Sequence, residues 1–277
     1  MIIQNNHSTL PAIRLVVTDL DETLFNAQSI ISNQNIQAIH HLKSKGIQFA
    51  IASGRAVSVV EKIASQHGIL QALDFIIGFN GAILGHLKTP SHIHLPHLSK
   101  EVIRLVVSQF SQVGLAFAVH EGNKLIASHY SDAIATEQTL NDYELVIVED
   151  FAAFIDKDYP KLMLVGTKAL LDDLDPKVTA FRGEMYHSFR SHGFFLEIVA
   201  PGVSKGETLM HYCREQGILA EEVMAVGDNA NDIEMIDFAG YGVAVDNAVI
   251  ALKAKAKYIT HHHNEDGFAE AVRHFIP

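Results

Sequence analysis

The chain has 277 residues, of which 48% are hydrophobic and only seven are proline, so it is too apolar for a disordered protein and is typical of a folded one. It carries 21 basic and 32 acidic residues, a formal net charge of −11, which argues against a nucleic-acid-binding or anionic membrane-binding surface. Cys213 is the only cysteine, which excludes an internal disulfide and a thiolate metal site. We expect Cys213 to be a small buried residue of a helix.

The segment 1–9 is polar and lacks the charged and apolar parts of a signal peptide, and no apolar run reaches the length of a membrane span. We therefore expect a soluble, cytoplasmic protein that binds neither nucleic acid nor membranes. We expect it to be a monomer or a weak homo-oligomer.

The first and last parts of the chain alternate short apolar runs with amphipathic segments, a pattern that predicts parallel strands joined by helices. The first part predicts strands at 13–17, 47–52 and 75–79, with helices that begin near Ser32 and Val57 and end at Gly46 and Gly68. The pattern resumes near residue 201 with a helix from Ser204 to Gly217, strands at 223–226, 241–245 and 258–260, and a helix after each of these strands.

The middle of the chain predicts hairpins mixed with helices. A hairpin or a loop is expected over 83–95 and a hairpin over 115–127. Further strands are expected at 145–148, 162–165, 185–189 and 194–199, and helices at 100–113, 132–140 and 167–174, the last ending at Pro176. The chain is therefore expected to be an α/β protein: a Rossmann-like doubly wound parallel sheet formed by residues 1–82 and 201–277, interrupted by an inserted α+β domain with an antiparallel sheet, residues 83–200.

Polar residues follow several of the predicted strands and begin one helix: Asp19, Asp21, Ser53, Asp228, Asp232 and Lys205. Each has an ordinary explanation on its own, as a turn residue, a helix cap or a solvated side chain. Because parallel strands bring their carboxyl ends to one edge of a sheet, together they favour a single crevice. Gly54 after Ser53 leaves a backbone N–H open at the start of the next helix, an arrangement that binds phosphate oxygens. The carboxylates of Asp228 and Asp232 are oxygen ligands of the kind that Mg²⁺ prefers.

Four segments resemble, in order, the four motifs of the haloacid dehalogenase-like hydrolases: Asp19-Leu20-Asp21-Glu22-Thr23-Leu24, Ala52-Ser53-Gly54-Arg55, Lys205-Gly206 and Gly227-Asp228-Asn229-Ala230-Asn231-Asp232. Three more are similar to the Cof-type branch, in which a large α/β cap domain is inserted between the second and third motifs: Asn80-Gly81-Ala82, Glu197-Ile198 and Asn264-Glu265-Asp266-Gly267-Phe268. One departure is Glu22, where the family most often has glycine, and we expect its side chain to project away from the metal.

The resemblance implies a Mg²⁺-dependent phosphomonoester hydrolase that acts on small phosphorylated metabolites, either a sugar phosphate or a cofactor phosphate. It implies that Asp19 is the nucleophile that forms an aspartyl-phosphate and that Asp21 is the general acid and base. The implied metal ligands are Asp19, Asp21 through its backbone carbonyl, Asp228 and Asp232, the last either as a ligand or as support. Ser53, Gly54 and Lys205 are implied to hold the phosphoryl group, Asn231 either to contact this group or to orient Asp19, and Thr23 to support the first motif.

The inserted domain is expected to set specificity, with residues 186–192 as its main contribution. Arg190 and His192 in this run are candidate substrate contacts, but for these two side chains we favour exposed surface. Arg55 is expected to pair with a nearby acid, with contact to an anionic substrate as the alternative. The run His92, His94 and His97 resembles a metal-binding pattern, but we interpret it as a surface loop.

Two other functions fit the same residues. A phosphosugar mutase passes the aspartyl-phosphate to a second hydroxyl group instead of water. A non-catalytic sensor of phosphorylated ligands keeps the fold but has no use for a general acid such as Asp21.

Overall fold

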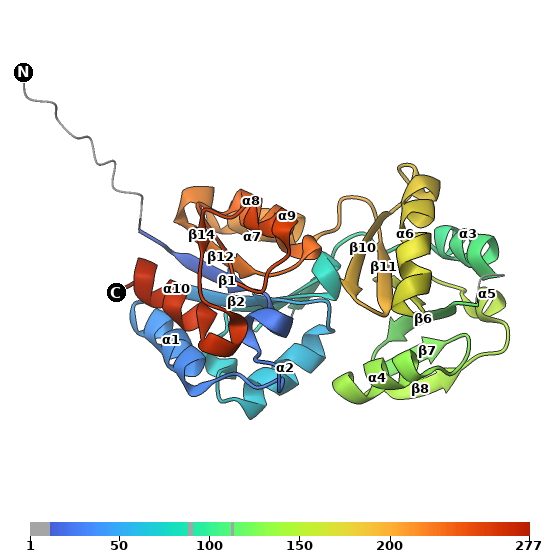
Figure 1. Ribbon diagram of the computed structural model, residues 1–277, viewed down its shortest axis with the longest axis horizontal. Coiled ribbons are helices and arrows are strands. Elements are labelled where there is room, and N and C mark those ends of the chain that lie inside the picture. Colours follow the sequence, from blue (N-terminus) through green and yellow to red (C-terminus); the bar gives the residue numbers. More distant parts are fainter. Residues whose placement is uncertain (1–11, 88–90, 112–113) are drawn as a thin grey trace, which may run out of the picture.

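The computed structural model describes residues 12–87, 91–111 and 114–277. The polar segment 1–9 and residues 88–90 of the predicted segment 83–95 lie outside these residues. Within these ranges the chain forms an eight-stranded and a six-stranded sheet, each with its own helices (Figure 1). No helix within the described ranges has the length and apolar character needed to cross a membrane.

The larger sheet has the strand order β14-β13-β12-β1-β2-β3-β4-β5 and is parallel from β14 to β3. Its strands are β1 (Leu15–Thr18), β2 (Gln48–Ala52), β3 (Phe75–Gly78), β4 (Ile83–His86), β5 (Ser91–His94), β12 (Val223–Gly227), β13 (Tyr241–Ala244) and β14 (Tyr258–Ile259). Helices cover both faces, as Figure 1 shows: α1 (Asn33–Ser44), α2 (Val57–Gln66) and α10 (Gly267–Phe275) on one, α7 (Lys205–Gln216), α8 (Ile233–Phe238) and α9 (Ile250–Lys253) on the other. The predicted α/β class with a Rossmann-like core is thus confirmed.

Strand β1 is the centre of this sheet. It pairs with β12 on one side and β2 on the other, with Leu15 opposite both Val223 and Gln48. All four of its residues are buried, as expected for a parallel strand covered on both faces. This register brings the carboxyl ends of β12, β1 and β2 side by side.

The smaller sheet has the order β10-β11-β9-β6-β7-β8 and is antiparallel except for the parallel pair β7 and β8. Its strands are β6 (Ala116–Glu121), β7 (Lys124–Ala127), β8 (Glu144–Ile147), β9 (Leu162–Val165), β10 (His187–His192) and β11 (Phe195–Val199). The helices of this part, which we call the insert (residues 96–200), are α3 (Lys100–Phe110), α4 (Asp132–Asn141), α5 (Phe151–Phe154) and α6 (Lys168–Arg182).

Strands β4 and β5 form the predicted hairpin, but they belong to the larger sheet and not to the insert, because β4 pairs with β3 and β5 pairs with β4. The pairing therefore favours a first boundary after β5. The division into residues 1–82, 83–200 and 201–277 stays a prediction.

The predicted end of a helix at Pro176 is wrong, because α6 continues through this proline to Arg182. Pro176 lies on the exposed face, where solvent can satisfy the carbonyl that loses its hydrogen-bond donor. The buried face continues past it, with Leu171, Leu174 and Val178 packed into the core of the insert. This packing outweighs the local preference of proline.

Candidate active site

Asp19, Ser53 and Asp228 each follow one of the three adjacent strands β1, β2 and β12. Because these strands are parallel and in register, the three residues emerge at the same edge of the sheet. Asp19 is held there by a hydrogen bond from its backbone N–H to the carbonyl of Val226, 2.9 Å. Lys205 reaches the same edge from the first turn of α7, whose N-terminus is capped by Ser204.

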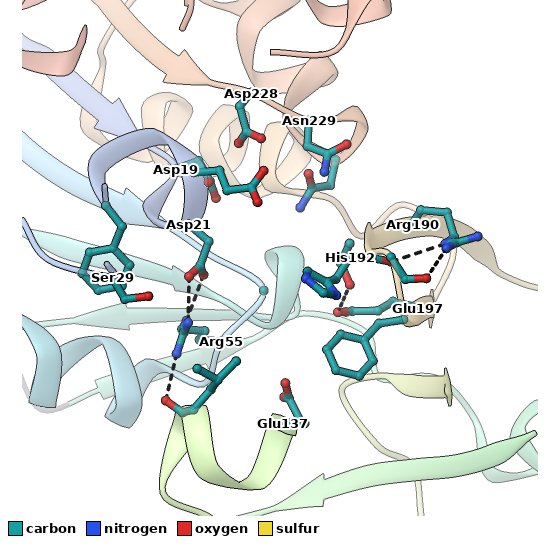
Figure 2. Close-up of a pocket in the computed structure, with 18 of the residues that line it drawn as sticks. Asp19, Asp21, Ser29, Arg55, Glu137, Arg190, His192, Glu197, Asp228 and Asn229 are labelled. Carbon is teal, nitrogen blue, oxygen red and sulfur yellow. Dashed lines mark hydrogen bonds and ion pairs between the residues drawn. The ribbon is translucent and has the colours of Figure 1, made fainter. Parts of the chain in front are cut away.

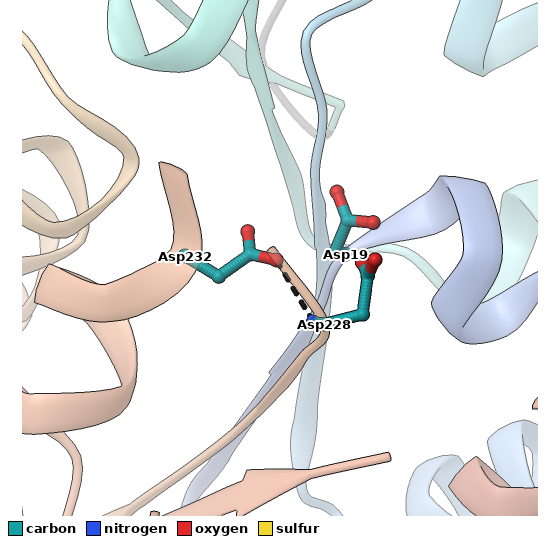
Figure 3. Close-up of side chains that lie close together, drawn as sticks. All are labelled: Asp19, Asp228 and Asp232. Carbon is teal, nitrogen blue, oxygen red and sulfur yellow. Dashed lines mark hydrogen bonds between the residues drawn. The ribbon is translucent and has the colours of Figure 1, made fainter. Parts of the chain in front are cut away.

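Asp19, Asp228 and Asp232 form a buried acidic cluster, in which one carboxylate oxygen of each lies within 4.8 Å of the others (Figure 3). Thr23 Oγ1 donates to Asp228 Oδ1 over 2.9 Å, so Thr23 joins the loop of the first motif to the fourth. Asp232 Oδ2 accepts from the backbone N–H of Asp228, 3.0 Å, which fixes the turn between them. Three converging carboxylates are a hard oxygen donor set that can hold a divalent cation.

Burial raises the pKa of Asp19 to about 7, and the neighbouring carboxylates add to the effect while Lys205 opposes it. Burial, with Asp19 and Asp232 nearby, raises the pKa of Asp228 to about 9. Three acids at this distance repel one another when ionised, so they need a positive charge among them. A divalent cation would supply it.

Lys205 already provides one positive charge to the cluster. Its Nζ lies 2.5 Å from Asp19 Oδ1 and 2.7 Å from Asp232 Oδ1, and its side chain is 1% exposed. Burial acts against the charge, but the two carboxylates outweigh it and raise the pKa of Lys205. Lys205 therefore stays charged at the back of the site.

The side chain of Asp21 does not join the acidic cluster. It points to Arg55, as Figure 2 shows, with Nη2 2.7 Å from Oδ1 and Nε 2.9 Å from Oδ2. The predicted pairing of Arg55 with a nearby acid is confirmed. That the backbone carbonyl of Asp21 is a metal ligand stays a prediction.

Ser53 and Gly54 form the tight turn after β2. Ser53 is fully buried, and its Oγ accepts from the backbone N–H of Arg55, 3.1 Å. A Cβ on Gly54 would lie 3.0 Å from Asn80 Nδ2, so glycine permits this close approach. The Gly54 carbonyl accepts from Lys161 Nζ, 3.0 Å.

A chain of hydrogen bonds links the fourth motif to the insert. Asn231 Nδ2 donates to Asn80 Oδ1 (2.9 Å), and Asn80 Nδ2 donates to Glu197 Oε2 (2.8 Å). Lys161 Nζ lies 3.0 Å from the same Glu197 oxygen, and Ser191 donates to the other, 2.6 Å. The sequence motifs include Asn80 and Glu197 but not Lys161, whose signal in the sequence is a charge directly before the apolar strand β9.

These side chains surround a cavity of about 860 Å³ between the sheet edge and the insert (Figure 2). Asp19, Asp21, Gly54, Asp228 and Asn231 line it, whereas Ser53, Lys205 and Asp232 are buried behind this lining. The insert contributes charged and polar groups of both signs, among them Glu137, Lys161, Asp172, Arg190, His192 and Glu197.

Arg190 and His192 line the cavity. That they contact the substrate stays a prediction. Arg190 is engaged by Asp172 Oδ1, 3.0 Å, and by the Gly193 carbonyl, 2.6 Å. His92 and His94 belong to β5, but their side chains lie outside the described residues. The described residues therefore give no support to a metal-binding site at His92, His94 and His97.

Glu22 adopts φ +57°, in the left-handed region that favours glycine. This explains in physical terms why a glycine suits the position. The side chain is exposed, and the backbone carbonyl accepts from Asn247 Nδ2, 2.7 Å.

The family model of the haloacid dehalogenase-like hydrolases matches residues 16–272. The chain belongs to this family. Relatives that match nearly the whole chain are named phosphatases, and together with the family model they support a phosphatase of the haloacid dehalogenase-like type. It is 28% identical to a phosphoglycolate phosphatase of Methanoculleus marisnigri, over 96% of this chain and 97% of that protein.

A second relative and a solved structure agree with this family membership. The chain is 28% identical to the 5-amino-6-(5-phospho-D-ribitylamino)uracil phosphatase YcsE of Bacillus subtilis, over 95% of this chain and 96% of that protein. The crystal structure of a haloacid dehalogenase-like hydrolase from Bacteroides thetaiotaomicron superposes with a TM-score of 0.84 at 29% identity, over 95% of this chain and all of that one. The family membership therefore extends over the insert as well as the larger sheet.

Proposed function

We propose that this protein is a Mg²⁺-dependent phosphomonoester hydrolase that acts on small phosphorylated metabolites through an aspartyl-phosphate. The observation that carries the proposal is the placement of Asp19. Its carboxylate lies at the end of the central strand, among Asp228, Asp232 and Lys205, and it lines the cavity that opens toward the insert.

The proposed reaction has two balanced steps. Asp19 attacks phosphorus, the bond from phosphorus to the leaving oxygen breaks, and Asp21 gives its proton to that oxygen. Asp21 then takes a proton from the water that attacks the aspartyl-phosphate, which frees Asp19 and inorganic phosphate. The Asp21 side chain is 48% exposed at the cavity, outside the buried cluster, so it can reach the leaving oxygen and the water once it is released from Arg55.

Asp19, Asp228 and Asp232 would hold Mg²⁺, with the backbone carbonyl of Asp21 as a further ligand. When bound, the ion would neutralise the acids and the charge of the phosphoryl oxygens. Ser53, the Gly54 backbone, Lys205 and Asn231 would hold those oxygens from the protein side, by positioning and by charge. Asn231 is oriented for this by Asn80.

The insert would serve as the cap that selects the substrate. The two relatives named above act, by their names, on different phosphorylated metabolites, and the mixed charges of the insert suit a polar leaving group. We propose a sugar phosphate or a cofactor phosphate as substrate. No nucleic-acid or membrane partner is proposed, in line with the net charge of −11.

The proposal is tested by a screen of phosphorylated metabolites with Mg²⁺ that measures released phosphate. Asp19→Asn should abolish release while the far-UV circular dichroism spectrum stays unchanged. Isomerised sugar phosphate with little free phosphate would show a mutase instead. Binding of phosphorylated metabolites without turnover by the wild-type protein would show a sensor.

A further inference from the structure

The carboxylate of Glu137 is a negative charge that the insert presents to the cavity. We propose that Glu137 accepts a hydrogen bond from a hydroxyl group of the leaving group, so that the enzyme accepts sugar and polyol phosphates and rejects phosphate esters that carry a carboxylate. The inference rests on the phosphatase reaction proposed above. It deepens that proposal because it narrows the class of substrate.

Glu137 lies on α4 and lines the cavity. Figure 2 shows it pointing into this space, on the side opposite Asp19. Its side chain is 12% exposed, and His120 Nε2 lies 3.4 Å from Oε1. Within the described part of the chain, no lysine or arginine forms an ion pair with this carboxylate. It can therefore accept a further hydrogen bond on the cavity side.

Glu137 is ionised at neutral pH. Burial acts against its charge, but the contact with His120 and the charges of Lys161 and Arg55 outweigh burial and lower the pKa of Glu137. Burial also lowers the pKa of His120, so the imidazole is neutral and the two side chains together keep a negative charge. A largely buried carboxylate is stabilised by hydrogen-bond donors, and a hydroxyl group of the substrate would supply one.

The cations of the insert that line the cavity are already engaged. Among the described residues they are Lys161, Lys168 and Arg190. Lys161 Nζ lies 3.0 Å from Glu197, and Asp172 pairs with the other two, at 2.7 Å and 3.0 Å. A carboxylate on the leaving group would have to displace one of these pairs and would meet the negative charge on α4, whereas a hydroxyl group requires neither change.

The experiment compares two phosphate esters that differ in one group. Sorbitol 6-phosphate has a primary alcohol at the position where 6-phosphogluconate has a carboxylate. We measure kcat/KM of the full-length protein with Mg²⁺ for both esters, with p-nitrophenyl phosphate as the reference for phosphatase activity.

Three variants separate the charge of Glu137 from its size and from the general charge of the cavity. Glu137→Gln removes the charge and keeps the size, and Glu137→Asp keeps the charge on a shorter side chain. Asp175→Asn is the matched control, because it removes a negative charge from the same cavity on α6.

We expect the wild-type protein to prefer sorbitol 6-phosphate by about 100-fold in kcat/KM. Glu137→Gln should reduce this preference to less than about 10-fold, mainly through faster hydrolysis of 6-phosphogluconate. Glu137→Asp and Asp175→Asn should keep the preference. The wild-type preference needs no variant, so it tests the inference even if Glu137→Gln fails to fold.

Equal kcat/KM values of the wild-type protein for the two esters, or an unchanged preference in Glu137→Gln, would overturn the inference. The same loss of preference in Asp175→Asn would also overturn it, because the general charge of the cavity would then decide. Hydrolysis of p-nitrophenyl phosphate but of neither polyol ester would overturn the inference and leave the proposed function in place. Hydrolysis of none of the three, nor of any screened metabolite, would overturn the proposed function.

Discussion

Lys161 Nζ lies 3.0 Å from Glu197 Oε2, and both side chains are almost completely buried, at 2% and 4% exposure. The pair stands where the insert meets the loop after β2, because Lys161 also donates to the Gly54 carbonyl. It therefore connects the insert to the proposed phosphate-binding turn through charged groups in a low-dielectric environment.

Replacement of one member of this pair should be costly. Glu197→Gln leaves the charge of Lys161 buried and uncompensated, so the free energy of unfolding should fall by about 3–5 kcal/mol. Urea unfolding measures it. The control is Asp173→Asn, which breaks an exposed ion pair with Lys177 and should leave the stability almost unchanged. Equal effects of the two substitutions would contradict the role of this buried pair.

The stability of the Mg²⁺-free protein should depend on pH. Burial raises the pKa of Asp19 to about 7 and that of Asp228 to about 9, from an ordinary 3.8, so the folded state binds protons that the unfolded state has already released. This contribution to stability is complete below about pH 4 and is lost as the pH rises toward about 9.

Mg²⁺ should oppose this loss, because it replaces the protons on the acidic cluster. The rise in melting temperature on adding Mg²⁺ after EDTA treatment should therefore be larger near pH 9 than near pH 5. Differential scanning fluorimetry at both values tests it. The same rise at both would argue against Asp19 and Asp228 as the groups that bind the ion.

Gly81 should tolerate no side chain. It adopts φ +110°, and a Cβ would lie 2.3 Å from the carbonyl oxygen of Ser204, just before Lys205. Gly81→Ala should lower the free energy of unfolding by about 3 kcal/mol and reduce kcat, because the N-terminus of α7 must move. Gly46→Ala is the control, since its φ is +72° with no atom within 4 Å of a Cβ, and it should cost about 1 kcal/mol with kcat unchanged. If both variants lost the same free energy of unfolding, backbone strain alone, and not the contact with Ser204, would explain the effect at Gly81.

Local signals predicted the elements well. Ser32 and Ser204 begin helices as expected, each accepting a hydrogen bond from a backbone N–H three residues later. The order of polar residues after apolar runs also predicted which strand each would follow, because the ends of parallel strands are set by the local pattern.

Long-range contacts were less predictable. The bonds from Arg55 to Asn141 and from Lys161 to Gly54 join residues far apart in the chain, and no local pattern encodes the docking of the insert. Pro176 was misread for a related reason, since packing of α6 against the insert core overrides the local preference.

The central claim is that Asp19 takes the phosphoryl group from the substrate. The most direct measurement is acid-quenched mass spectrometry of the Asp21→Asn protein after a single turnover of p-nitrophenyl phosphate with Mg²⁺, since Asp21→Asn slows the attack of water. The account predicts one phosphoryl group on the peptide that contains Asp19, and none in the double variant with Asp19→Asn. Release of one equivalent of p-nitrophenol without a phosphoryl group on that peptide would contradict it.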